Sequence, residues 1–478
     1  MAAASNSINH RWADHQLIHP PRHHHVPAPF LPPEIIDRIL SFLEVQFDMR
    51  DQEEAGQRSA RVQRDLWACT LVNRQWNACT VQRLWKNPLI MSPEDFSRFV
   101  ECCAISQDAG AHVLRLDTSL FRVAEPRDTL LIRSGIGYMP NLRLLKMSCD
   151  HFRAESLDEI FDRCQDIQLF SLSGTPEINL NAPLQHQSIL NTHGDLWDFK
   201  KHPGTVRGIR KLSALCLNNV TFVEEEADFY WLLYHGLDSN DSGGNNLVHL
   251  NLGRTWVTDA ILAPFAEVCP RLQSIVLEEN SDITDWSIER LAKSCQQLRF
   301  VKLRNAIQVG DRGVICLVTL CRNLAFLGIS YTGCTDETLR AISAHAKNLH
   351  TLFMNDLNLS SEKALIDLIT KRGPQLKTLG MASIDVVSKA FCVTLAKHCP
   401  NLEELDIAGC NGDMMVDRID EESADLVVNS CPKLRTFLVG TNDGISDAYL
   451  ARLSEKVCID QFWLPPPDEL TGADALYL

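Results

Sequence analysis

One short pattern of apolar residues recurs along most of the chain after about residue 110. An apolar residue is followed by two more, three and five positions later, and residues two apart share one face of a strand. In the most regular part, steps of 25 to 27 residues separate copies that begin at Leu247, Leu272, Leu298, Leu324, Leu349, Leu376 and Leu402. One unit of this length cannot bury its apolar face alone, so the units must stack around a continuous core.

Further copies extend the series in both directions, beginning at Ala111, Leu142, Ile167, Leu212, Leu434 and Ile459. The second half of a unit shows apolar residues at helical spacing after a polar residue that can cap a helix, as in 283–295, 309–321 and 445–457. The sequence therefore predicts strands that alternate with helices along the whole series.

A cysteine stands three residues before the strand pattern in six units, at Cys164, Cys269, Cys295, Cys321, Cys399 and Cys431. Ala346 and Gly373 hold the same position in two others, and a small side chain suits a tight junction between helix and strand. Pattern, period and cysteines together resemble the cysteine-containing class of leucine-rich repeats. That resemblance implies an α/β solenoid shaped like a horseshoe, with parallel strands inside and helices outside.

The sequence predicts these parts in order: a disordered tail over 1–29, a helical module over 30–90 with an insertion at 44–64, the solenoid over 91–466, and an acidic tail over 467–478. Insertions near 173–210, 224–246 and 411–422 interrupt the repeats, and we expect them to form loops along one face, where loops often serve binding. His23, His24 and His25 leave metal binding open as an alternative for the first tail, whose composition favours disorder.

The helical module begins with an apolar segment that follows two prolines, which suit the first turn of a helix. Two adjacent stripes occur there at helical spacing: Ile35, Ile39 and Phe42, and Ile36, Leu40 and Leu43. A helix this short needs only one stripe to cover a small core. We therefore expect one stripe to face its own domain and the other to face a partner.

A second helix carries Leu66, Cys69, Val72 and Trp76 on one side, and a third short element carries Val81, Leu84 and Trp85. With these elements the module resembles the F-box, which binds the Skp adaptor of SCF ubiquitin ligases. The matching positions are Leu31, Pro32, Glu34, Ile35, Ile39, Leu40, Leu43, Asp65, Leu66, Cys69, Leu71, Val72, Asn73, Trp76, Leu84 and Trp85. The insertion at 44–64 departs from the family, in which a few residues join the first two helices, and it puts adaptor contacts near that loop in question.

The resemblance implies which residues face the adaptor: Leu31, Pro32, Ile35, Ile39, Leu40, Leu66, Val72 and Trp76. For Cys69, Trp76 and Trp85 there is an alternative, in which these side chains form the core of a small helical domain.

An F-box followed by leucine-rich repeats implies the substrate-recognition subunit of an SCF-type ubiquitin ligase. The module would bind the Skp adaptor and through it a cullin/RING core, and the solenoid would present a protein substrate for ubiquitin-dependent proteasomal degradation. Other subunits carry the transfer chemistry in such a complex, so the chain would be a non-catalytic receptor without a cofactor. Two alternatives remain: an adaptor-binding scaffold with no degradation role, and a repeat protein that regulates an enzyme.

Strand residues that alternate with the apolar pattern should lie on the concave face of the horseshoe. Among them we expect a substrate-binding surface made of Phe300, Lys302, Arg304, Phe326 and Phe353, since aromatic and charged residues together are typical of binding hot spots. In the alternative, a neighbouring loop or the acidic tail covers these phenylalanines.

Composition narrows the function further. A net charge of −15 argues against binding to nucleic acid. No signal-like or membrane-spanning run occurs, so we expect a cytoplasmic or nuclear protein whose 17 cysteines are thiols. The chain also lacks the spacing of a zinc site, a phosphate-binding glycine loop and a serine nucleophile elbow, so no metal or catalytic residue is predicted.

Overall fold

The fold is described from a computed structural model. It covers residues 31–44, 63–105, 107–118, 132, 134–148, 154–173, 203–218, 246–410, 418–440 and 442–459. The two predicted tails, the insertion at 224–246 except its last residue, and most of the other insertions lie outside these residues.

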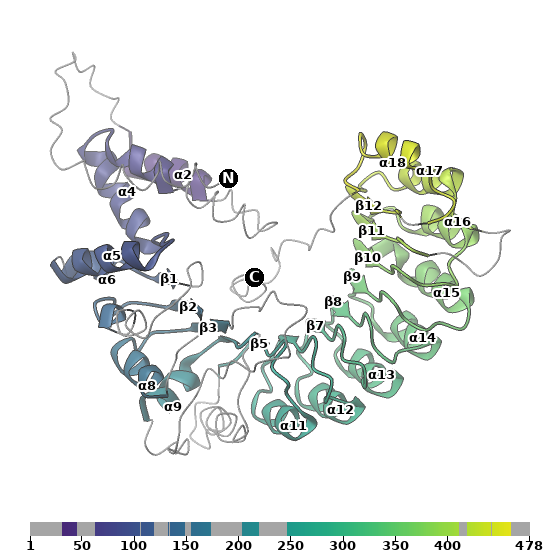
Figure 1. The fold of residues 1–478 in the computed structure, drawn as a ribbon, viewed down its shortest axis with the longest axis horizontal. Coiled ribbons are helices and arrows are strands. Elements are labelled where there is room, and N and C mark those ends of the chain that lie inside the picture. Colours follow the sequence, from purple (N-terminus) through teal and green to yellow (C-terminus); the bar gives the residue numbers. More distant parts are fainter. Residues whose placement is uncertain are drawn as a thin grey trace, which may run out of the picture.

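Twelve parallel strands form one sheet in sequence order, each pairing with the next along the chain. They are β1 (Arg115–Asp117), β2 (Leu144–Ser148), β3 (Leu169–Ser173), β4 (Ala214–Cys216), β5 (His249–Asn251), β6 (Ser274–Val276), β7 (Phe300–Lys302), β8 (Phe326–Gly328), β9 (Thr351–Phe353), β10 (Thr378–Gly380), β11 (Glu404–Asp406) and β12 (Thr436–Leu438). The predicted α/β solenoid is confirmed. Figure 1 shows the strands on the inner side of a curved stack and the helices on its outer side.

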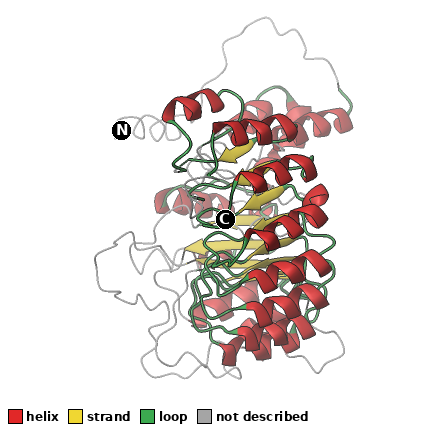
Figure 2. Ribbon diagram, turned by 90° about the vertical axis from the view of Figure 1, so that its right-hand side faces the viewer, coloured by secondary structure: helices red, strands yellow, loops and turns green. Residues whose placement is uncertain are grey.

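The helices before and among the first strands are α2 (Pro33–Glu44), α4 (Arg74–Lys86), α5 (Pro93–Ile105), α6 (Gln107–Ala111), α8 (Ala154–Arg163) and α9 (Pro203–Lys211). Residues 63–70 are helical as well. Those of the later repeats are α11 (Asp259–Val268), α12 (Asp285–Ser294), α13 (Asp311–Leu320), α14 (Asp336–His345), α15 (Glu362–Arg372), α16 (Lys389–His398), α17 (Glu421–Ser430) and α18 (Asp447–Leu453), with a short 3-10 turn, η1 (Gly373–Gln375), after α15. In the turned view these helices lie in a column beside the strands (Figure 2).

Two predicted boundaries need correction. Helix α9 lies at the end of the segment expected to be an insertion over 173–210, and it packs beside α8, where Thr205 N donates to Asp158 Oδ1 at 2.8 Å. That part of the segment is therefore the helix of its own repeat. Residues expected in a third short element of the module belong to α4, which begins after Asn73 because the Asn73 side chain accepts from Trp76 N at 2.9 Å.

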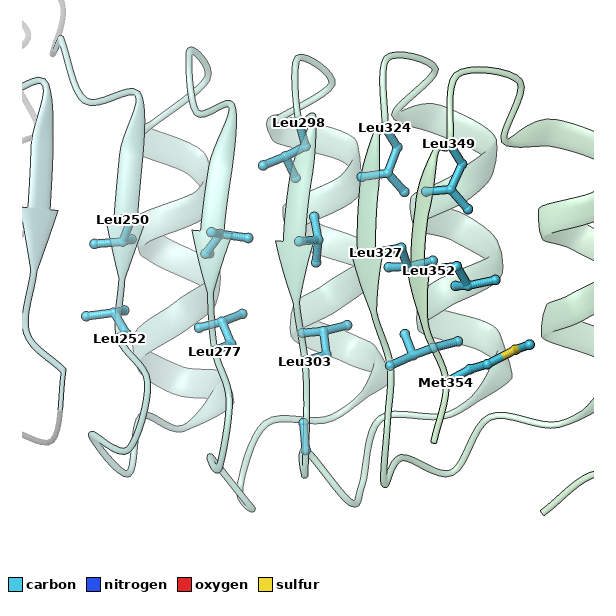
Figure 3. Packing of buried hydrophobic residues seen from close by; sticks show 14 of the residues in the cluster. Leu250, Leu252, Leu277, Leu298, Leu303, Leu324, Leu327, Leu349, Leu352 and Met354 are labelled. Carbon is cyan, nitrogen blue, oxygen red and sulfur yellow. The ribbon is translucent and has the colours of Figure 1, made fainter. Parts of the chain in front are cut away.

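The apolar pattern supplies the core. The central residue of each strand pairs directly with its counterpart in the next, as Ile275 does with Val301 and Val301 with Leu327. All three are fully buried. Figure 3 shows such side chains aligned from repeat to repeat between the strands and the outer helices. Each repeat thus covers the apolar face of the one before it, and a single repeat could not bury its own apolar face.

The recurrent cysteines close the junctions between repeats. Cys164, Cys269, Cys295, Cys321, Cys399 and Cys431 are all about 1% exposed or less. Cys295 Sγ lies 3.2 Å from Cys269 O and 3.5 Å from Ala266 O, so the thiol meets carbonyls at the end of the preceding helix. Burial raises the pKa of the Cys321 thiol to about 12, which keeps it protonated and able to donate. These thiols therefore serve packing, as their repeat position predicted.

Carboxylates at the first turn of successive helices join the outer edges of the repeats. Asp259 accepts from the backbone N–H of Thr284 at 2.8 Å and from its hydroxyl at 2.6 Å. Asp311 accepts in the same way from Thr335 at 2.8 and 2.7 Å, and also from Thr338. Asp285 accepts from Gly310 N and Gly313 N at 2.8 and 2.9 Å. Asp336 likewise accepts from Ser360 N at 3.1 Å. We call Asp259, Asp285, Asp311 and Asp336 the carboxylate ladder.

The ladder predicts an effect of charge on stability. Burial alone would raise the pKa of Asp311, but hydrogen bonds from Thr338 and Thr335 hold that pKa below its ordinary value. The Asp311→Asn variant should lower the free energy of unfolding by about 2 kcal/mol at pH 7, because the amide loses charge-assisted hydrogen bonds.

A carboxylate whose pKa falls on folding stabilises the protein above about pH 4, and this stabilisation disappears as the pH drops through the folded pKa. Urea unfolding at pH 7 and near pH 3 should therefore show the variant's deficit shrinking in acid. The control is Asp356→Asn, at an exposed carboxylate, which should stay within about 0.5 kcal/mol of the wild type. A deficit that does not shrink in acid would contradict the role of the charge.

Candidate interaction surfaces

The helical module has a small core of its own. Ile36 and Leu40 on α2 and Leu66 on the next helix are 0 to 2% exposed. These three side chains form one apolar cluster. Leu31, Cys69, Trp76, Cys79 and Leu84 are partly buried against this cluster. The expectation that Leu40 and Leu66 face an adaptor is therefore wrong, because both side chains are removed from the surface. The alternative for Cys69 and Trp76, in which they pack in the module, agrees with these contacts.

The second stripe of α2 lies on the surface. Ile35 and Ile39 are 44% and 38% exposed, one turn apart on the helix. Val72 is also exposed, as is Pro32, whereas Leu31 is only partly exposed. The two-stripe pattern therefore separated buried from exposed positions correctly for the four residues whose side chains the structure describes. Phe42 and Leu43, at the end of the same stripes, lie outside the described side chains.

Two further exposed apolar residues were not among the predicted site residues. Trp67 is 46% exposed and Leu71 is 69% exposed, and they follow the buried Leu66 along the same helix and its final turn. Their signal was present in the sequence, since a tryptophan beside a buried leucine, followed by an apolar residue four positions later, repeats the two-stripe arrangement of α2. We call Ile35, Ile39, Trp67, Leu71 and Val72 the module surface.

Polar contacts fix the module's helices against each other. Arg83 on α4 pairs with Asp37 on α2, with 2.6 Å between Arg83 Nη2 and Asp37 Oδ1. Gln63 Nε2 donates to Asn87 O, just beyond α4, at 2.8 Å. The exposed apolar residues are thus held on a defined scaffold, which lowers the ordering cost of any binding there.

The module joins the solenoid without a spacer. Trp85, near the end of α4, stacks on Phe99 of α5 with 5.4 Å between ring centroids. Leu114 N, just before β1, donates to Lys86 O at 3.0 Å. Phe96 and Val100 of α5 belong to the core of the repeats, and Trp85 packs against that core. Trp85 is therefore a residue of the joint between the two parts.

The three phenylalanines of the concave face pack on one another. Phe300 and Phe326 pair in register on β7 and β8, and their ring centroids are 3.9 Å apart. Phe353 lies 5.5 Å from Phe326, over Gly380, where an added Cβ would come within 2.6 Å of the ring. With Val276 they form a separate apolar cluster, in which Phe300 and Phe326 are only 9% and 5% exposed. Their predicted role as an exposed binding surface is wrong for these two rings.

Other groups at the same strand positions are also shielded from water. His249 on β5 is buried, and burial lowers the pKa of its imidazole to about 4. Asp406 on β11 is 8% exposed, and burial raises the pKa of its carboxyl. Both shifts favour the neutral form and mark a region from which solvent is excluded. The centre of the concave face is thus poor in exposed side chains.

Exposed polar side chains lie instead where the strands end. Lys302 pairs with Glu278 at 2.7 Å, and Arg304, two residues later, is half exposed. Arg304 lies 3.9 Å from Glu279, a residue that also pairs with Arg254 at 2.7 Å. Of the predicted substrate-binding residues, Lys302 and Arg304 therefore retain access to solvent at the edge of the sheet, and Phe353 is partly exposed.

The phenylalanine contacts predict a structural role for the middle ring. Replacing Phe326 with alanine should lower the free energy of unfolding by about 3 kcal/mol, because it removes a buried ring that packs on two others. Chemical unfolding of the full chain measures the effect. The control is Tyr331→Ala, at an exposed ring just after β8, which should lower the free energy of unfolding by less than about 1 kcal/mol. Similar values for the two variants would argue that Phe326 is a surface residue after all.

The architecture defines a leucine-rich-repeat solenoid protein with a helical module at its N-terminal end. No protein-family model matches the chain. An internalin from Listeria monocytogenes is 17% identical, with a TM-score of 0.43 over 76% of this chain and 94% of that one. A structure of the Rad7 and Elc1 complex in yeast gives 17% identity and a TM-score of 0.45, covering 91% of this chain and 98% of the matched one.

Two further observations concern metal binding and membrane spans. Within the described ranges, no group of three or more His, Cys, Asp and Glu side chains could hold a metal ion. In the same part of the chain, no helix combines the length and the apolar character needed to cross a membrane.

Proposed function

We propose that this chain is the substrate-recognition subunit of an SCF-type ubiquitin ligase. In this proposal the module surface binds a Skp-type adaptor, which connects the chain to a cullin/RING core, and the solenoid holds a protein substrate. The observation that carries the proposal is the exposed apolar stripe of α2, which accompanies the F-box resemblance. Among the described residues, the cluster that forms the module's core does not include Ile35 or Ile39.

The chemistry of the module surface supports a protein partner. Ile35, Ile39, Trp67, Leu71 and Val72 are 38 to 69% exposed, on a module whose core is small. Exposed large apolar side chains favour burial against another protein, at about 25 cal/mol per Å² of apolar area removed from water. Tryptophan in particular is common among interface hot spots.

The contacts also revise the set of adaptor residues. Leu40 and Leu66 are omitted because they are buried, whereas Leu31 and Trp76 are only partly buried against the core of the module. Leu31, Pro32, Ile35, Ile39, Val72 and Trp76 therefore remain, and Trp67 and Leu71 join them. Leu31 is positioned by Gln75, whose Nε2 donates to Leu31 O.

Binding to purified Skp adaptor tests the proposal. The Ile39→Asp/Leu71→Asp variant should bind the adaptor at least about 100-fold more weakly than the wild type, because two apolar contacts worth about 3 kcal/mol together are replaced by charges. Both positions are exposed, so the melting temperature should change little. Val393→Asp, at a residue 53% exposed on α16, is the matched control and should bind like the wild type.

Failure of the wild-type chain to bind the adaptor would overturn the proposal, as would equal binding by the double variant. A chain that binds the adaptor but recruits no cullin would favour the interaction scaffold without a degradation role. Adaptor and cullin binding are therefore measured on the same preparation, by titration with each purified partner.

A further inference from the structure

A row of unusual backbone conformations follows the strands of the regular repeats. In seven consecutive repeats, the residue two positions after the last apolar residue of the pattern has φ between 56° and 67°; these residues are Arg254, Glu279, Asn305, Tyr331, Asp356, Ser383 and Gly409. Each backbone N–H in this row donates to a carbonyl of the next repeat at 2.8 to 3.2 Å. The conformation thus recurs at the same place in every one of these repeats.

Glycine adopts this left-handed region freely, whereas other residues pay about 1 kcal/mol for it. Only Gly409 in the row is a glycine, and Tyr331 is a bulky residue of the type that seldom occurs there. At these positions glycine would have the lower backbone energy, yet six of the seven residues carry a side chain. Such a cost is usual where a side chain serves a function.

Four side chains from neighbouring repeats meet at this edge. Glu279 Oε1 is 2.7 Å from Arg254 Nη2 and 3.9 Å from Arg304 Nη1, so one carboxylate lies between two guanidinium groups. Arg304 Cζ in turn lies 5.8 Å from the centre of the Tyr331 ring. We call Arg254, Glu279, Arg304 and Tyr331 the rim strip, which runs across the repeats of β5, β6, β7 and β8.

The rim strip is accessible and locally cationic. The side chains of Arg254 and Arg304 are 42% and 50% exposed, and Tyr331 is 40% exposed. Lys302 and Glu278 neutralise each other beside it at 2.7 Å, so within the strip itself two arginines face the one carboxylate of Glu279. The exposed carboxylate of Asp356 stands one repeat beyond Tyr331. This excess positive charge occurs on a chain with a net charge of −15, so it attracts anions at a place where the rest of the molecule repels them.

Aromatic and apolar side chains border the charges. Trp256, two residues after Arg254, is 45% exposed. Ile307, two residues after Asn305, is 59% exposed. Tryptophan, tyrosine and arginine are the residues most often responsible for binding energy at protein interfaces. The same edge can therefore bind an anionic group and an adjacent apolar side chain.

We propose that the rim strip recognises a short acidic peptide segment of the partner that the solenoid holds. An anionic group of that segment, either a carboxylate or a phosphate, would bind between Arg254 and Arg304, and a neighbouring apolar side chain would contact Tyr331, whose ring lies beside Arg304. Neighbouring strands lie about 4.8 Å apart, so the strip spans about 14 Å, which four or five residues of extended peptide can cover. This inference names the class of substrate and so rests on the proposed function.

Arrays of seven-residue peptides test the inference. Peptides with leucine or phenylalanine at the centre carry glutamate, phosphoserine, serine or lysine at the flanking positions, and the fluorescently labelled full chain is the probe. Peptides with glutamate or phosphoserine should bind at least tenfold more strongly than their lysine counterparts, because only these groups can form charge-assisted hydrogen bonds with guanidinium. Binding by phosphoserine alone would identify phosphate as the source, and binding by both would show that carboxylates suffice.

Three variants then assign the binding to the rim strip. Arg254→Gln/Arg304→Gln should weaken acidic peptides about tenfold, whereas Arg322→Gln, at an exposed arginine at the helix-to-strand junction, should leave their affinity unchanged. Glu279→Gln should increase the affinity severalfold, because it removes the carboxylate that competes for both arginines. A misfolded protein would not give such a gain.

Equal binding of acidic and lysine peptides would overturn the inference, and so would acidic-peptide binding that survives the double arginine substitution. Adaptor binding is measured on the same proteins. A chain that binds the adaptor but no acidic peptide would refute the rim strip alone. A chain that binds acidic peptides but no adaptor would refute the ligase role and leave the rim strip as a peptide site.

Discussion

Contact between consecutive repeats is the constraint on which the rest of the structure depends. Each repeat is too small to bury its own apolar face, so its stability comes from the neighbours on either side. Three sets of contacts repeat at this boundary: apolar strand residues in register, thiols against the carbonyls of the preceding helix, and the carboxylate ladder at the helix starts. Because the ladder uses charged acceptors, its hydrogen bonds are stronger than those between neutral groups.

The same regularity distributes side chains between buried and accessible places. On the concave face, parallel register sets equivalent residues of adjacent repeats directly against each other, so aromatic rings at these positions stack and withdraw from solvent, as Phe300 and Phe326 do. Just after the strands of the regular repeats the backbone turns into the left-handed region, and several side chains there are exposed. Groups available to a partner are consequently found at the edge of the sheet and on the helical module.

Much of the fold could be predicted from the sequence because the repeat pattern fixes the strands. The copy beginning at Leu272, for example, predicts the strand Ser274–Val276, with Ile275 inward. The alternation within each strand also gave the correct face for Phe300 and Phe326. It could not show their burial, because burial depends on contacts between repeats, and one repeat read alone contains no such information.

The site on the helical module shows a different limit. The two stripes of α2 predicted that one set of positions is buried and the other exposed, since helical phase separates them, but they did not show which stripe is which. Leu40 and Leu66 were assigned to the surface from family resemblance, but helical phase places Leu40 with the buried Ile36, and Leu66 packs in the same cluster. Trp67 and Leu71 were not among the predicted site residues, because the apolar stripe of Leu66, Cys69, Val72 and Trp76 does not include them.

The joint at Trp85 and Phe99 determines how far the molecule can reach. Two parts connected by a flexible tether sample many separations, and the concentration of one near the partner of the other falls as the tether lengthens. Here the stacked rings and the hydrogen bond from Leu114 to Lys86 leave no tether between module and solenoid. The curved stack therefore acts as a lever of fixed length, and cargo held along it would be presented at a distance set by the number of repeats that separate it from the module.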